Sequence, residues 1–75
     1  MKQQQFEQLH HQQWELLAHD LEKLAQHKTS LDAHAVVNFP QLYRQVCQHL
    51  AIARDRHYTP ALIERLNRLV LDGHQ

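Results

Sequence analysis

Apolar residues recur along this chain at spacings of three and four, which is the repeat of an amphipathic α-helix. No Gly or Pro interrupts residues 2–27, and the repeat there predicts one long helix. Leu9 and Leu16 widen its apolar stripe on one flank, while Gln, Glu and Lys fill the other positions. The predicted inward residues are Phe6, His10, Trp14, Leu17, Leu21 and Leu24.

A connector over residues 28–38 follows, with room for a short extra helix over 31–36. Asn38 then precedes Phe39-Pro40, a pattern typical of an N-cap followed by proline in the first helical turn. We therefore expect a second helix to begin there and to end near Arg56. Its predicted inward residues are Phe39, Leu42, Tyr43, Val46, Leu50 and Ala53.

Thr59-Pro60 repeats the cap-then-proline pattern and predicts a third helix from Pro60 to about Asp72, with Gly73 as the residue that terminates it. Three apolar stripes with short connections predict an all-α fold, an antiparallel three-helix bundle that occupies residues 1–75 as a single domain. The predicted inward residues of the third helix are Leu62, Ile63, Leu66, Leu69 and Val70.

Composition agrees with an all-α globular chain, because 43% of the residues are apolar and only one is Gly and two are Pro. Cys47 is the single cysteine, so an internal disulfide framework is excluded. The chain begins with a polar segment rather than a secretory signal. No apolar run approaches the roughly 18 residues that a membrane span requires. We expect the chain itself to be soluble.

A formal net charge of zero conceals an uneven distribution. Residues 1–30 carry a net charge of −1, whereas residues 41–68 carry +3, all of it from arginine. Eight histidines add charge on acidification, and we expect them to be solvated on the surface. If His10, His49 or His57 is instead buried, the fold should loosen below about pH 6, because a buried neutral histidine must then become charged.

Spacing gives no catalytic, cofactor-binding or metal-binding residue. His10 and His11 diverge around a helix, and Cys47 and His49 point in nearly opposite directions, so neither pair forms a metal or nucleophile site. Cys47 is interpreted as a structural thiol and Trp14 as a core anchor. Tyr43 should lie in the core with its hydroxyl at the bundle edge, and Asn67 should bond across to a neighbouring helix or loop. We therefore expect that the protein is not an enzyme and binds no cofactor.

A surface of arginines remains, formed by Arg44 and Arg54 on the second predicted helix and Arg65 and Arg68 on the third. Two helices joined by a short turn with outward arginines allow an alternative function, a small helix-turn-helix DNA-binding protein. The third helix opens with Pro60-Ala61-Leu62-Ile63 rather than with polar base-reading residues, and the net charge is zero, so nucleic acid is not the favoured partner. Ile52 and Leu71 face away from the predicted stripes, either as isolated surface residues or as contacts for another part of a longer protein.

Several short segments in order are similar to the N-terminal soluble domain of stage II sporulation protein M-like integral membrane proteins. The similarity covers most of the chain except the 28–38 connector, and Phe6 and Trp14 fit the same pattern. The matching segments are Leu42-Tyr43-Arg44, Leu50-Ala51-Ile52-Ala53-Arg54, and Leu66-Asn67-Arg68-Leu69-Val70 with His74.

This resemblance implies a helical domain that precedes membrane-spanning helices in a longer bacterial protein. The chain stops at Gln75, before any such helix, so we expect an excised N-terminal domain on the cytoplasmic side of the bacterial inner membrane. The expected function is that of a non-catalytic interaction domain. Its expected partner is another protein or the membrane-embedded part of its own longer chain, with an anionic membrane surface as a further option for the arginines.

Overall fold

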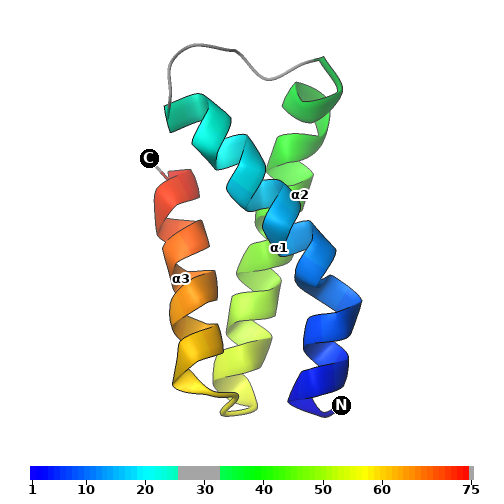
Figure 1. The fold of residues 1–75 in the computed structure, drawn as a ribbon, viewed down its shortest axis with the longest axis vertical. Coiled ribbons are helices and arrows are strands. Elements are labelled where there is room, and N and C mark those ends of the chain that lie inside the picture. The colour runs from blue at the N-terminus through cyan, green and yellow to red at the C-terminus, as the bar shows by residue number, and fades with distance from the viewer. Residues whose placement is uncertain (26–32, 75) are drawn as a thin grey trace.

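Three helices pack into a bundle of 38 × 19 × 15 Å in the computed structural model (Figure 1). The structure describes the backbone of residues 1–25 and 33–74, and the side chains of residues 1–25 and 38–74. The helices are α1 (Gln3–Ala25), α2 (Ala33–Asp55) and α3 (Pro60–His74). α2 and α3 lie side by side and run in opposite directions, while α1 crosses them obliquely. The predicted all-α three-helix bundle is confirmed.

The start of α2 differs from the prediction. The helix begins at Ala33, so Pro40 lies inside it rather than in its first turn. Residues 33–38 are the opening turns of α2 instead of a separate short helix, and residues 28–32 of the predicted connector lie outside the described residues. A proline inside a helix removes one backbone hydrogen bond and is tolerated where tertiary contacts hold the helix. Phe39, packed against the core, provides such a contact beside Pro40.

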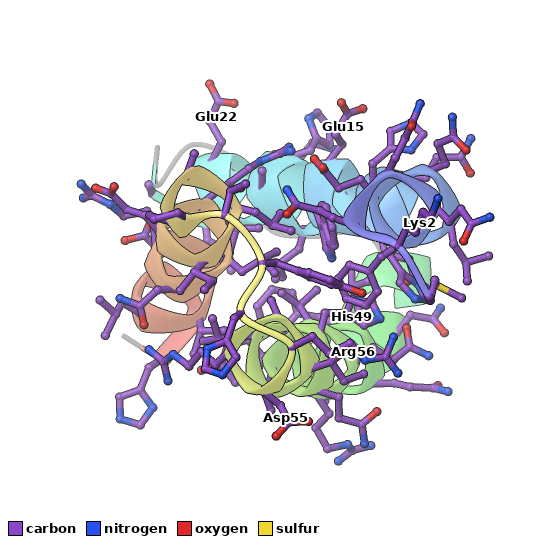
Figure 2. The ribbon with its side chains drawn as sticks, turned by 90° about the horizontal axis from the view of Figure 1, so that it is seen from below. Lys2, Glu15, Glu22, His49, Asp55 and Arg56 are labelled. Atoms are coloured by element: carbon purple, nitrogen blue, oxygen red, sulfur yellow. The ribbon has the colours of Figure 1, made fainter. Side chains whose placement is uncertain are left out.

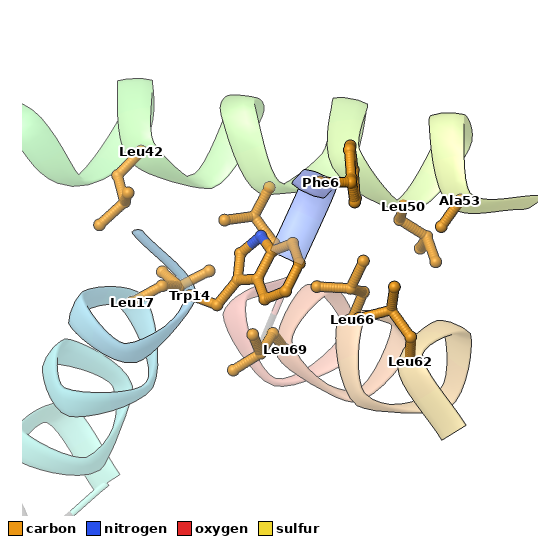
Figure 3. Close-up of a cluster of buried hydrophobic side chains, with 10 residues drawn as sticks. Phe6, Trp14, Leu17, Leu42, Leu50, Ala53, Leu62, Leu66 and Leu69 are labelled. Carbon is orange, nitrogen blue, oxygen red and sulfur yellow. The ribbon is translucent and has the colours of Figure 1, made fainter. Parts of the chain in front are cut away.

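The core is built from one stripe of each helix, with Trp14 at its centre (Figure 3). Trp14, Leu17, Val46, Ala53 and Leu66 are fully buried. The remaining core members come from the predicted stripes: Phe6, Leu42, Leu50, Leu62 and Leu69. Burial of these apolar side chains is the main source of stability in so small a domain. Leu24, predicted to face inward, is 43% exposed near the end of α1.

The turn between α2 and α3 is a Schellman motif. The Tyr58 amide donates to the Ala53 carbonyl at 3.0 Å, and the His57 amide donates to the Arg54 carbonyl at 3.2 Å. His57 has φ 57° at the position that glycine usually occupies, because the motif requires a left-handed residue there. This turn sends the chain directly into α3 at Pro60, as the sequence predicts.

Gly73 does not terminate α3, contrary to the prediction. The helix continues through His74, and no glycine among the described residues has a positive φ. The Tyr43 ring lies against Gly73 so closely that a Cβ atom there would be 2.5 Å from Tyr43 Cε1. Gly73 is therefore needed for this close approach between α2 and α3.

Candidate functional site

A polar pair lies inside the core, between α1 and α2. Trp14 Nε1 donates a hydrogen bond of 2.9 Å to His49 Nδ1, and His49 is only 7% exposed. Figure 2 shows His49 directed toward α1 from α2. Since Nδ1 accepts the bond, the neutral ring carries its proton on Nε2. The bond therefore requires the uncharged form of His49.

Aromatic rings surround this pair. The His10 ring stacks on His49 with centroids 3.9 Å apart, and the Phe6 ring meets both histidines edge-on, at 4.9 Å from His10 and 5.8 Å from His49. Burial, with a smaller effect from a positive charge on His10, lowers the pKa of His49 to about 4. His49 is thus uncharged near neutral pH, and its protonation would break the hydrogen bond from Trp14.

The expectation that the histidines are all solvated is wrong for His49, which is buried, and His10 is half-buried. His57 is exposed, as expected. The described residues contain no group of three or more His, Cys, Asp or Glu side chains placed to hold a metal ion. Stacked imidazole rings do not converge their nitrogens on one point, so the histidine pair does not form a metal site.

Other polar side chains at the helix contacts also bond within the bundle. The Tyr43 hydroxyl donates to the Val70 carbonyl at 2.8 Å, at the edge of the core as predicted. Burial, followed by the neighbouring Cys47, raises the pKa of that hydroxyl. Asn67 bonds across to α2, because its Oδ1 accepts from Arg54 Nη2 at 3.1 Å. Cys47 is half-buried beside these groups.

The arginine surface is partly used by the bundle itself. Arg54 donates to Asn67, and the Arg65 guanidinium lies 5.8 Å from the centroid of the Trp14 ring, a cation–π distance. Arg44 and Arg68 are exposed. The described helices include none long and apolar enough to cross a membrane.

Two apolar predictions are reversed by the way α1 crosses α2. Leu9 and Leu16, expected to widen the apolar stripe, are 62% and 53% exposed. Ile52, expected to face away, is half-buried and packs against the core. Leu71 is 54% exposed, as expected.

The exposed leucines of α1 belong to a surface without formal charge, which we call the neutral face. A hydrogen bond of 3.3 Å from Gln13 Nε2 to Gln45 Oε1 joins α1 to α2 in the middle of it. The spacings of three and four within each helix place the other members on the same side. The neutral face consists of Leu9, Gln12, Gln13 and Leu16 of α1 with Gln45 and Gln48 of α2.

Sequence reasoning did not identify the neutral face. The sequence does contain a pattern that points to this face, because Leu9 and Leu16 are seven residues apart with Gln12 and Gln13 between them, and Gln45 and Gln48 lie three apart in α2. That pattern does not show which side of α1 meets α2. Only the crossing of the two helices decides it.

A groove lies at the opposite end of the bundle from the α2–α3 turn. It is mostly apolar, with Glu22 and Asp72 at its edges. Its other lining residues are Ala18, Leu21, Leu24, Ala25, Phe39, Leu69 and Gly73.

Comparison with known proteins gives one match. A family model described as "Domain of unknown function (DUF8413)" matches residues 4–75. No curated protein matches the chain, and no solved structure matches it.

Proposed function

This chain belongs to the domain family that matches residues 4–75, and we propose that it serves as a non-catalytic interaction domain of a bacterial membrane protein. The single observation that carries the proposal is the exposure of Leu9 and Leu16, at 62% and 53%, two turns apart on the same side of α1. Isolated exposed leucines are ordinary, but two on the same side of one helix favour an interaction surface.

The side chains best suited to acid–base chemistry are already hydrogen-bonded within the bundle, which supports a binding function rather than a catalytic one. Trp14 and His49 bond to each other in the core, and the Tyr43 hydroxyl bonds to a backbone carbonyl. A general base must reach the proton that it removes from a substrate. The buried Nδ1 of His49 already accepts a hydrogen bond from the Trp14 indole N–H. These side chains stabilise the bundle that presents the outer surface.

The membrane part of the proposal is supported by the sequence resemblance to stage II sporulation protein M-like proteins and by the distribution of arginine. Arg44 and Arg68 are exposed and can lie near anionic lipid headgroups. Arginine close to a membrane segment is typical of the cytoplasmic side. The proposed location is therefore the cytoplasmic side of the bacterial inner membrane, with the domain contacting another protein or the membrane-embedded part of a longer chain.

The helix-turn-helix alternative is less well supported. Its two helices, α2 and α3, are joined by a short turn, but the exposed Arg54 and Arg65 already contact Asn67 and Trp14 of the bundle. Glu64 and Asp72 lie exposed on α3 and oppose phosphate attraction. Titration with duplex DNA at two salt concentrations tests it, and salt-sensitive submicromolar binding would replace the interaction proposal.

The proposal is tested in cells that carry the native gene. An antibody to the domain should detect a band longer than the 75-residue chain in the membrane fraction, extractable with detergent but not with high salt. A photocrosslinking residue at Leu16 should give an adduct, whereas the same residue at exposed Glu22, which points away from α2 and α3 in Figure 2, should give none. A band in the detergent-free soluble fraction overturns the membrane part. Absence of an adduct at Leu16 overturns the interaction part.

A further inference from the structure

The neutral face has the properties of a surface that meets itself. We propose that two copies of this chain pair through their neutral faces about a two-fold axis, with α1 of each copy lying along α2 of the other. This inference rests on the proposed interaction function and names its partner as a second copy.

Charge is the first argument. In a two-fold interface the same surface is used by both copies, so a charge near the axis meets its own kind. The six members of the neutral face are uncharged, and charged residues on the same side of α1 begin only at Asp20 and Lys23, four and seven residues beyond Leu16. The exposed amides of Gln12 and Gln48 each carry both donors and an acceptor and can therefore pair with an identical amide, whereas Gln13 and Gln45 bond to each other. Such a surface is complementary to itself, whereas a surface adapted to a basic or acidic partner would carry the opposite charge.

Leu9 and Leu16 supply the apolar centre. They lie seven residues apart on α1, which is about 10 Å along the helix axis. Both are more than half exposed in the single chain. Pairing would remove four such side chains from water, two from each copy, with glutamines at their edges. This is the arrangement of apolar centre and polar rim that stable interfaces show.

Opposite charges border the face and determine the direction of the axis. Glu15 follows Gln12 by three residues, and it points to the outer side of α1 in Figure 2. Exposed Arg44 precedes Gln48 by four residues and borders the face on the outer side of α2. When α1 of one copy lies along α2 of the other, Glu15 of each copy meets Arg44 of the other. Turning one copy end over end instead would place α1 on α1 and lose both pairs.

The oligomeric state of the chain tests the proposal directly. Sedimentation equilibrium of the 75-residue chain should show a monomer–dimer equilibrium between roughly 5 and 500 µM, the range of a weak interface. The double variant Leu9→Lys, Leu16→Lys should be monomeric throughout. Leu71→Lys is the matched control, because Leu71 is 54% exposed on α3, outside the neutral face, and this variant should dimerise like the wild type.

The edge charges give a second and sharper test. Glu15→Arg alone, or Arg44→Glu alone, should weaken the dimer roughly tenfold, since two like-charged contacts replace two opposite ones. The double variant Glu15→Arg, Arg44→Glu should restore the wild-type dissociation constant. Circular dichroism of every variant should show unchanged helix content. Loss of dimer in the single variants without recovery in the double variant overturns the proposed axis.

Two outcomes overturn the dimer as a whole. One is a folded wild-type chain that remains monomeric at roughly 500 µM. The other is an equal loss of association in Leu71→Lys and in the double leucine variant, because the contact would then not be the neutral face. Neither outcome affects the cell-fractionation result, which tests membrane attachment separately.

Discussion

Trp14 and His49 are joined by a hydrogen bond of 2.9 Å that crosses from α1 to α2 inside the core. The bond exists only while His49 Nδ1 is unprotonated. A positive charge on the stacked His10 ring also opposes protonation of His49. The Arg65 guanidinium also lies near this pair, 5.8 Å from the centroid of the Trp14 ring. The contact between α1 and α2 is therefore linked to the protonation of one buried histidine.

Acidification should destabilise the bundle through His49. The folded-state pKa is lowered to about 4, so the unfolded chain, with an ordinary value near 6.5, binds the proton first. The contribution is complete above about pH 6.5 and is lost as the pH falls from there toward 4. We expect the free energy of unfolding, measured with urea, to fall by about 1 to 2 kcal/mol between pH 7 and pH 5.

Two variants separate His49 from the other histidines. His49→Gln keeps an acceptor for the Trp14 indole but cannot titrate, so its stability should be lower at pH 7 and nearly independent of pH between 7 and 5. His19→Gln removes an exposed histidine of α1 and should keep the wild-type pH dependence. An unchanged pH slope in His49→Gln would show that another group is responsible.

Substitution of Gly73 tests the contact between α2 and α3. Helix propensity alone predicts that Gly73→Ala stabilises α3 by up to about 1 kcal/mol. The new Cβ would lie 2.5 Å from Tyr43 Cε1 and 2.7 Å from Cδ1, so the ring must move, and this strains the hydrogen bond from its hydroxyl to the Val70 carbonyl. We expect a net destabilisation of about 1 kcal/mol in urea unfolding.

The sign of the change in unfolding free energy shows whether the contact with Tyr43 outweighs helix propensity. Repeating Gly73→Ala in a variant without the Tyr43 ring tests the cause. In Tyr43→Leu the ring is absent, and Gly73→Ala should then be stabilising. Asp72→Ala, at the exposed neighbouring position, should be stabilising, because alanine has the higher helix propensity and an acidic group near the C-terminus of a helix is unfavourable. A stabilising Gly73→Ala in the wild-type background would contradict the close contact.

The helices and most of the core could be predicted because spacings of three and four record which side of each helix is apolar. The start of α2 could not, since Asn38, Phe39 and Pro40 imitate a helix start in the middle of a longer helix. Local capping patterns are weak evidence when neighbouring turns are held by tertiary contacts.

The polar cluster was missed for a different reason. His49 follows Val46 by three residues and precedes Ala53 by four, so its spacing placed it on the buried stripe. The general tendency of histidine to be exposed nevertheless favours a surface position. What the sequence did not show is the partner, because Trp14 and His49 are 35 residues apart and meet only through the crossing of α1 and α2.

The Gln3 side chain should contribute more to the stability of the bundle than the side chain of its exposed neighbour Gln4. Its side-chain Oε1 accepts from the Thr59 amide at 2.9 Å, and its Nε2 donates to the Thr59 hydroxyl at 2.9 Å. Both bonds join the start of α1 to the start of α3. We expect Gln3→Ala to lower the free energy of unfolding by about 1 to 2 kcal/mol. Gln4→Ala, the matched control at an exposed position, should change it by less than about 0.5 kcal/mol, and equal effects would show that the Thr59 bonds contribute nothing.

His57 should be a site where the chain can be stabilised by a single substitution. Its φ of 57° lies in the left-handed region, which costs an ordinary residue roughly 1 kcal/mol and glycine very little. Because the His57 side chain is exposed, His57→Gly should raise the free energy of unfolding by about 1 kcal/mol. His57→Ala retains a Cβ and should give no such gain. If alanine stabilised as much as glycine in urea unfolding, the effect would come from loss of the imidazole rather than from relief of the left-handed conformation.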